Sequence, residues 1–189
     1  VGEHMNGLQM AGIANITASK LNGVQIALCN YATQARGLQI GLVNYYKEDM
    51  KGFQLGLVNA NPDTRVQMMV YGGNTTPANI GVRFKNQLFY TILGIGSMYQ
   101  GLNDKFSASA SYRAGLSFTL YKGLSISGDL GYQHIEAFDN KDEVIPKRLY
   151  ALQARANLEY QFTRKFGIFA TGGYGLTRFY NKSSNYDKG

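Results

Sequence analysis

The sequence has no tryptophan, one cysteine, three prolines and only 16% charged residues. A single cysteine, Cys29, excludes a disulfide framework and a paired-cysteine metal site; we expect it to be a packed small residue inside a strand. An average soluble domain has about 25% charged residues, so the surface is poor in charge. No run approaches the ~18 apolar residues of a membrane-spanning helix, which excludes helical spans but leaves spanning strands open.

Glycine and aromatic residues are abundant instead, with 23 glycines, 14 tyrosines and 10 phenylalanines. This composition is typical of many close-packed strands and predicts an all-β fold. The net charge is +7, but the lysines are spread over predicted turns and strand ends. Because no basic stripe or stacking motif is visible, nucleic acid is not an expected partner.

A short phrase occurs four times in the first third of the chain. It begins at glycines that are 16, 14 and 15 residues apart: Gly7, Gly23, Gly37 and Gly52. Each copy has a glutamine two positions after the glycine (Gln9, Gln25, Gln39 and Gln54) and ends on an asparagine (Asn15, Asn30, Asn44 and Asn59). A period this short is one strand and one turn, so residues 1–65 are predicted to be a repeat region of about 15-residue β units.

After the repeats the predicted strands lengthen and alternate between apolar and polar residues. They are expected at 66–72, 78–84, 87–99, 106–121, 124–138, 148–162 and 166–180. Strict alternation over 9 to 14 residues matches the ~9–11 residues with which a tilted strand crosses a bilayer. Most connections are of turn length, and one, residues 139–148, is longer and charged, which is the asymmetry of an outer-membrane barrel.

The apolar face can point in either of two directions. In a soluble barrel it fills the core, whereas in a membrane barrel it meets lipid and the polar face lines the interior. The polar face has no mid-strand lysine but holds four charged residues that we expect to pair as a lumen charge network: Arg113, Asp129, Arg155 and Glu159. This pattern favours the membrane orientation.

Aromatic residues lie near the ends of the predicted apolar faces. They are Phe118, Tyr121, Tyr132, Tyr150, Tyr160 and Phe162. Lipid-facing barrels have aromatic girdles at both membrane interfaces, so these six residues are predicted to form a girdle.

The fold of the repeats has two alternatives. Turn-length connectors favour a meander, in which residues 1–65 continue into the barrel of residues 66–189. This preferred fold has eleven predicted strands, and because bacterial barrels close with an even number, about twelve strands are expected, with the last missing from this chain. The alternative is a short β-solenoid joined to an 8-stranded barrel, which the identical phase of each repeat favours.

The phrases at residues 37–44 and 52–59 resemble a family of bacterial surface-repeat proteins with copies of G-V-Q-I-G-L-V-N. In that family the repeats precede a segment similar to outer-membrane β-barrel domains, and residues 82–180 look like that segment. The resemblance implies the outer membrane or cell surface of a Gram-negative bacterium. It brings no catalytic residues with it.

The sequence predicts no enzyme, no cofactor and no metal site. His134 and Glu136 share a face near a strand end and could be half of a lipid-hydrolase site, but no serine motif marks a nucleophile, and a rim histidine is the alternative. We therefore expect a structural or protein-interaction role at the cell surface, alone or within a larger membrane assembly, with outer-membrane lipid and other envelope proteins as partners. A small passive channel and, less favoured, a lipid-modifying enzyme are the alternatives.

Overall fold

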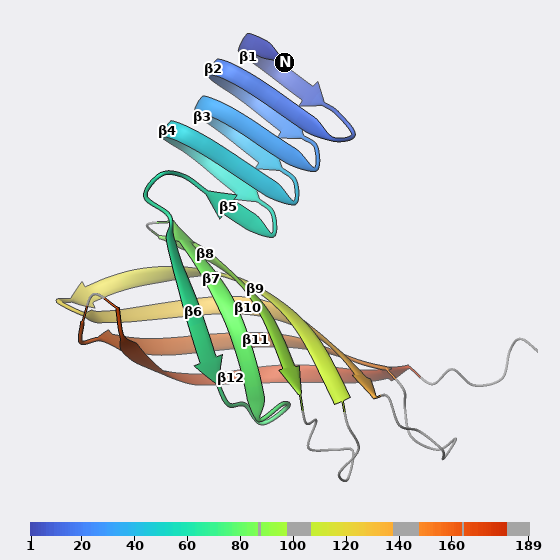
Figure 1. The fold of residues 1–189 in the computed structure, drawn as a ribbon, viewed down its shortest axis with the longest axis vertical. Coiled ribbons are helices and arrows are strands. Elements are labelled where there is room, and N and C mark those ends of the chain that lie inside the picture. The colour runs from blue at the N-terminus through green and yellow to red at the C-terminus, as the bar shows by residue number, and fades with distance from the viewer. Residues whose placement is uncertain (87, 98–106, 138–147, 164, 181–189) are drawn as a thin grey trace, which may run out of the picture. The chain divides into compact units, whose positions relative to one another are not determined.

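The computed structural model describes residues 1–86, 88–97, 107–137, 148–163 and 165–180. These residues form twelve strands in two sheets, one of five strands and one of seven (Figure 1). None of their segments is a helix of the length and apolar character needed to span a membrane. The chain divides into two compact units, residues 1–67 with 83–91 and residues 68–82 with 92–189.

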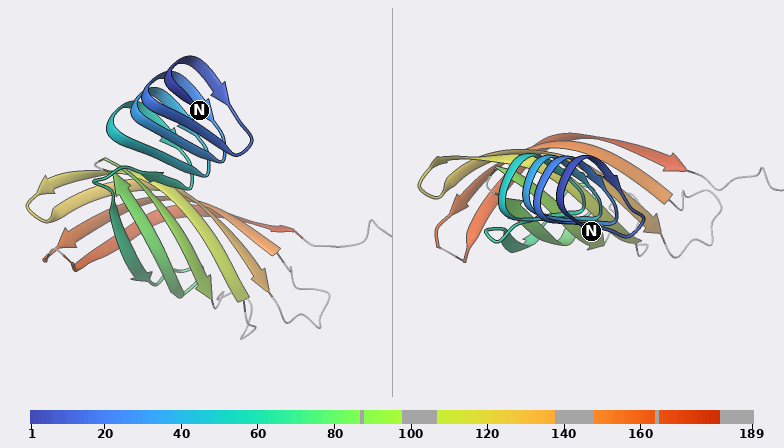
Figure 2. Two further views of the ribbon diagram at one scale, coloured as in Figure 1. Left: turned by 45° about the horizontal axis from the view of Figure 1, so that its top comes forward. Right: turned by 90° about the horizontal axis from the view of Figure 1, so that it is seen from above.

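The first sheet consists of the repeats. Its strands are β1 (Gly2–Met10), β2 (Ala14–Ile26), β3 (Cys29–Ile40), β4 (Val43–Leu55) and β5 (Val58–Ala60). Neighbouring strands are consecutive in the chain and pair in parallel, with the glycine, glutamine and asparagine of each repeat in register with those of the next. Figure 2 shows the result as a stack of similar coils. The repeats are therefore a parallel β-sheet of solenoid type.

The preferred prediction of a continuous antiparallel meander is wrong for the repeats, and the solenoid part of the alternative is confirmed, without its 8-stranded barrel. Antiparallel neighbours run in opposite directions and cannot place each repeat residue beside its own copy, whereas parallel coils in register do so at every position. Cys29 is also exposed, contrary to the expectation of a packed residue.

The repeat glycine is required by the close approach of successive coils. Gly37 has a φ of +133°, a backbone conformation that favours glycine. A Cβ atom at this position would lie 2.0 Å from the carbonyl oxygen of Gly23 in the preceding coil. The same conformation recurs at Gly52, so each coil turns at a point where only hydrogen fits.

The second sheet contains the long alternating strands. They are β6 (Arg65–Tyr71), β7 (Ala78–Asn86), β8 (Phe89–Ser97), β9 (Ser107–Tyr121), β10 (Leu124–Ala137), β11 (Arg148–Gln161) and β12 (Gly167–Tyr180). They lie side by side in chain order, and β9 to β12 pair antiparallel in long ladders. Each strand lies close to its predicted range. The predicted loop at 139–148, apart from Arg148, falls outside the described residues.

The described sheet is open rather than a closed barrel. It has seven strands, not the predicted eight or twelve, and its outermost strands are β6 and β12. The sheet is nevertheless strongly curved. The curvature is shown by the ring of Tyr71 on β6, which meets the ring of Phe169 on β12 edge-on with 6.3 Å between centroids. Side chains of the two edge strands thus meet across the concave face.

The second sheet buries its polar face and exposes its apolar face. Leu130, Leu152 and Leu176, on three neighbouring strands, have exposed fractions of 71%, 64% and 57%. Ser127, Asp129 and Gln133 alternate with such residues along β10 and are 4–5% exposed. The concave face is therefore largely polar, although Ile92, Ile135 and Leu149 of this sheet are also buried, and the convex face has the composition of a protein core.

Candidate functional site

The repeat glutamines form a hydrogen-bonded ladder through the solenoid. The Nε2 group of Gln25 donates to Oε1 of Gln9 at 2.9 Å, Gln39 donates to Gln25 at 2.8 Å, and Gln54 donates to Gln39 at 2.9 Å. Gln25 and Gln39, in the middle, are fully buried. Gln25 and Gln39 each donate to one copy and accept from another, so the ladder fixes the register of the coils.

The repeat asparagines form a second ladder. Asn15, Asn30 and Asn44 each donate through Nδ2 to the Oδ1 atom of the next asparagine, at 3.1, 2.9 and 2.8 Å, the last reaching Asn59. The same groups also donate to main-chain carbonyls where the chain turns, as from Asn44 to Leu55 O at 3.0 Å. The four glutamines and four asparagines of the repeats therefore hold the coils together from inside the solenoid. The side chains that point outward form its surface.

Apolar side chains cover part of that surface. Leu8, Val24, Leu38 and Phe53 occupy one register position, and Met10, Ile26, Ile40 and Leu55 occupy another two residues further on. At the two outermost coils these side chains are more than half exposed, for example Phe53 at 75% and Met10 at 66%. The repeats therefore present two adjacent apolar rows.

The four predicted lumen charges all lie on the concave face of the second sheet. Asp129 and Arg155 are directly opposite each other on β10 and β11. Asp129 accepts a hydrogen bond from Nδ2 of Asn157 at 2.8 Å, and Arg155 donates to Oε1 of Gln153. Arg113 places its guanidinium over the ring of Tyr71, 4.6 Å from the centroid. The ion-pair network among the four residues remains a prediction.

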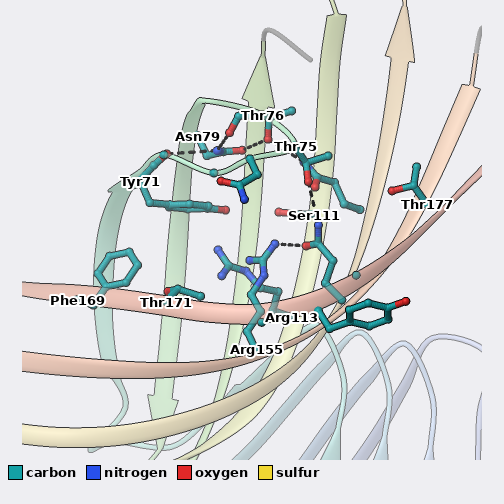
Figure 3. Close-up of a pocket in the computed structure, with 18 residues that line it drawn as sticks. Tyr71, Thr75, Thr76, Asn79, Ser111, Arg113, Arg155, Phe169, Thr171 and Thr177 are labelled. Carbon is teal, nitrogen blue, oxygen red and sulfur yellow. Dashed lines mark hydrogen bonds between the residues drawn. The ribbon is translucent and has the colours of Figure 1, made fainter. Parts of the chain in front are cut away.

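A pocket of about 360 Å³ opens on the same face (Figure 3). Arg113 and Arg155 line it, together with the segment 72–77 that joins β6 to β7. This segment is fixed to the sheet because Gln133 donates to Oγ1 of Thr76 at 3.0 Å and Gln153 donates to Oγ1 of Thr75 at 3.3 Å. The connection between two strands is therefore one wall of the pocket.

Sequence reasoning placed the two arginines on one face but missed the other pocket residues. The missed groups include Tyr71, Thr75, Gln133 and Gln153. Both glutamines belong to the polar positions of alternating strands, which was a usable signal. Tyr71 and Thr75 gave none, because the curvature that brings them over the arginines depends on the packing of seven strands.

The predicted girdle residues fall into two groups at opposite ends of the strands. Phe118, Tyr121, Tyr160 and Phe162 lie near the β9–β10 turn, as the pairing of Leu124 with both Tyr121 and Tyr160 shows. Tyr132 and Tyr150 stack 5.8 Å apart toward the other end. Five of the six side chains are 41–73% exposed, and Tyr150 is half-buried.

His134 lies near the end of β10, beside Glu136 and Tyr150. Its Nε2 atom is 3.8 Å from Oε2 of Glu136, and its ring lies 4.8 Å from that of Tyr150. Glu136 also faces Nε of Arg148 at 3.4 Å. In the described part of the chain these contacts include no serine hydroxyl. That part of the chain also has no cluster of three or more histidine, cysteine or acidic residues suited to a metal ion.

Comparison of the chain with protein-family models, with curated proteins and with solved structures found no match.

Proposed function

We propose that this is an outer-membrane β-barrel protein of a Gram-negative bacterium, with a structural or protein-interaction role at the cell surface. The observation that carries the proposal is the inverted second sheet. Its apolar side chains are exposed on every strand from β6 to β12, for example Met68, Ile80, Ile95, Phe118, Leu130, Leu152 and Leu176. Its buried residues include arginine, aspartate, serine and glutamine, together with a smaller apolar group of Ile92, Ile135 and Leu149.

The energetics support lipid as the solvent of the convex face. Monomeric proteins in water seldom expose continuous apolar patches larger than a few hundred Å². Each large apolar side chain left in water forgoes about 1.5–3 kcal/mol that burial would provide, and lipid supplies that burial. The two groups of exposed aromatic residues at opposite strand ends suit the two interfaces of a bilayer.

A sheet in lipid must also satisfy the main-chain groups of its edges. Because unpaired N–H and C=O groups cost several kcal/mol each in hydrocarbon, we propose that β6 and β12 close into a barrel, directly or through further strands. The contact between Tyr71 and Phe169 supports closure, since the two edge strands already approach closely enough for their inward side chains to meet.

The solenoid is the proposed interaction module. Its ladders give a rigid coil stack, and its apolar rows, which include Leu8 and Phe53, offer a surface for other envelope proteins or for a larger membrane assembly. A passive channel is less well supported, because segment 72–77 is hydrogen-bonded across the concave face to Gln133 and Gln153.

Labelling of neighbouring positions tests the membrane orientation. Cysteine would be introduced at Leu130, on the convex face, or at Ser127, on the concave face, in a Cys29→Ser background, and labelled with an environment-sensitive fluorophore. We expect a lipid-attached quencher to act on the label at 130 and much less on the label at 127 in reconstituted vesicles. Equal quenching of both labels by an aqueous quencher alone, with protein soluble without detergent, would refute insertion. Altered gel migration of unheated against boiled samples would separately test barrel closure.

A further inference from the structure

Arg113 is a buried cation with two guanidinium nitrogens that have no hydrogen-bond partner among the described residues. Its residue is 2% exposed, and its Nε and Nη2 atoms are buried with no hydrogen-bond partner in the described part of the chain. The ring of Tyr71, 4.6 Å from the guanidinium carbon, stabilises the positive charge through a cation–π contact. The ring provides no oxygen acceptor for the Nε and Nη2 hydrogens. Buried guanidinium N–H groups without acceptors are costly, so such a group marks a place where an acceptor is expected.

The pocket around Arg113 is positive. Arg155 enters the same pocket, as Figure 3 shows, and the lining residues among those described include no carboxylate and no lysine. The remaining lining groups are hydroxyls, amides and aromatic rings, such as Thr75, Thr171 and Phe169. An anion in this partly enclosed space would be attracted by both guanidinium groups, although Asp129 lies opposite Arg155 on the neighbouring strand.

The sheet leaves room for both arginine side chains. Gly131 lies opposite Arg113 on the neighbouring strand, and a Cβ there would be 2.8 Å from Cγ of Arg113. Gly173 lies opposite Arg155, and its Cβ would be 3.0 Å from Cγ of that arginine. Each arginine thus crosses a glycine on the adjacent strand, which allows both stems to lie along the sheet within the pocket.

From these observations we infer that the pocket between Arg113 and Arg155 binds a small organic anion through a phosphate or carboxylate group. Guanidinium groups match both of these oxyanions with paired N–H donors. The pocket of about 360 Å³ accommodates a molecule of the size of a phosphorylated or carboxylated sugar, whose hydroxyls the threonine and glutamine side chains can bind. The inference concerns the concave face alone and does not depend on membrane insertion.

Calorimetric titration of the full chain tests the inference. The probes are inorganic phosphate, glucose 6-phosphate, glucuronate and neutral glucose, each added to about 10 mM to reach weak binding. We expect at least one charged sugar to bind and glucose not to bind, and the comparison of glucose 6-phosphate with glucuronate to identify the preferred oxyanion. Absence of binding by every anion to folded wild-type protein would overturn the inference.

Three matched variants locate the binding. Arg113→Gln and Arg155→Gln are each expected to weaken the anion about tenfold or more, because each removes a charge-assisted hydrogen-bonding group. Arg148→Gln removes the same charge from an exposed arginine outside the pocket and is expected to leave affinity within about twofold. Should Arg113→Gln fail to fold, Arg155→Gln decides alone, since Arg155 is only half-buried. Equal loss in all three variants, or in none, would contradict a site between the two arginines.

Discussion

The two sheets of this protein both bury polar side chains, but they use them differently. In the solenoid the buried amides inside each ladder, such as Gln39, are bonded on both sides to copies of themselves. In the antiparallel sheet the buried groups are of different types, and Arg113 keeps N–H groups that no described residue accepts. Identical polar residues repeated in register satisfy each other's hydrogen-bonding groups and so stabilise the fold. Buried polar residues of different types, which are not repeated in this way, can keep donors that a ligand could use.

The largest expected effect comes from the glycine that permits the coils to stack. Gly37→Ala would place a Cβ 2.0 Å from a carbonyl oxygen of the preceding coil, at a φ of +133°. We expect a loss of about 3 kcal/mol or more in the stability of the repeats, measured by amide hydrogen exchange over residues 1–60. Gly12→Ala is the control, because its Cβ would meet no atom within 4 Å. Equal protection in both variants would contradict this account of the repeat.

The next effect tests the convex face of the antiparallel sheet. If the proposed membrane orientation holds, Leu130→Arg is expected to lower the stability of the protein in vesicles by about 2–4 kcal/mol, since a charge would enter the hydrocarbon. The variable measured is the urea midpoint of reversible unfolding, and Leu130→Met is the control. If the convex face met water, an arginine at a position that is 71% exposed would be nearly neutral. A neutral result would therefore favour the soluble orientation.

An effect of similar size is expected in the middle of the glutamine ladder, and a smaller one at its end. Gln39→Leu leaves Oε1 of Gln25 and Nε2 of Gln54 without their ladder partners, whereas Gln54→Leu affects only Gln39. We expect a cost of about 2–4 kcal/mol at position 39 and about half as much at position 54. Hydrogen exchange of β2, β3 and β4 measures both. Equal losses of stability in the two variants would show that the number of broken ladder hydrogen bonds does not determine the cost.

The sequence predicted the antiparallel sheet better than the solenoid, for reasons that lie in particular residues. Alternation along residues 107–120 and 150–162 depends only on the two faces of a strand, so strand positions and face identity were accessible. The parallel direction of the repeats was harder, because a repeat of one strand and one turn fits a meander as well as a coil. The decisive signal was the identical phase of Gln25 and Gln39, which was recognised but given less weight than the short connectors.

The binding site was only half predictable. Arg113 and Arg155 share a polar face by sequence position, but their predicted partners were carboxylates on the same face. In the structure Arg113 instead lies over Tyr71, which belongs to a strand more than forty positions earlier in the chain. Curvature that depends on all seven strands brings these residues together, and no local pattern encodes it.

The smallest expected effect has the opposite sign and returns to the contrast between the two sheets. Replacing a ladder residue should destabilise the protein, but Arg113→Met removes a buried cation whose Nε and Nη2 atoms have no described acceptor. A methionine fills similar volume without that desolvation cost, so we expect the ligand-free sheet to gain about 1 kcal/mol, seen as a higher urea midpoint. Gln133→Met is the contrasting variant, because Gln133 donates to both Thr76 and Ser109 and its loss should destabilise. If Arg113→Met lowered the stability, the arginine would be a residue that stabilises the fold and not one that serves anion binding.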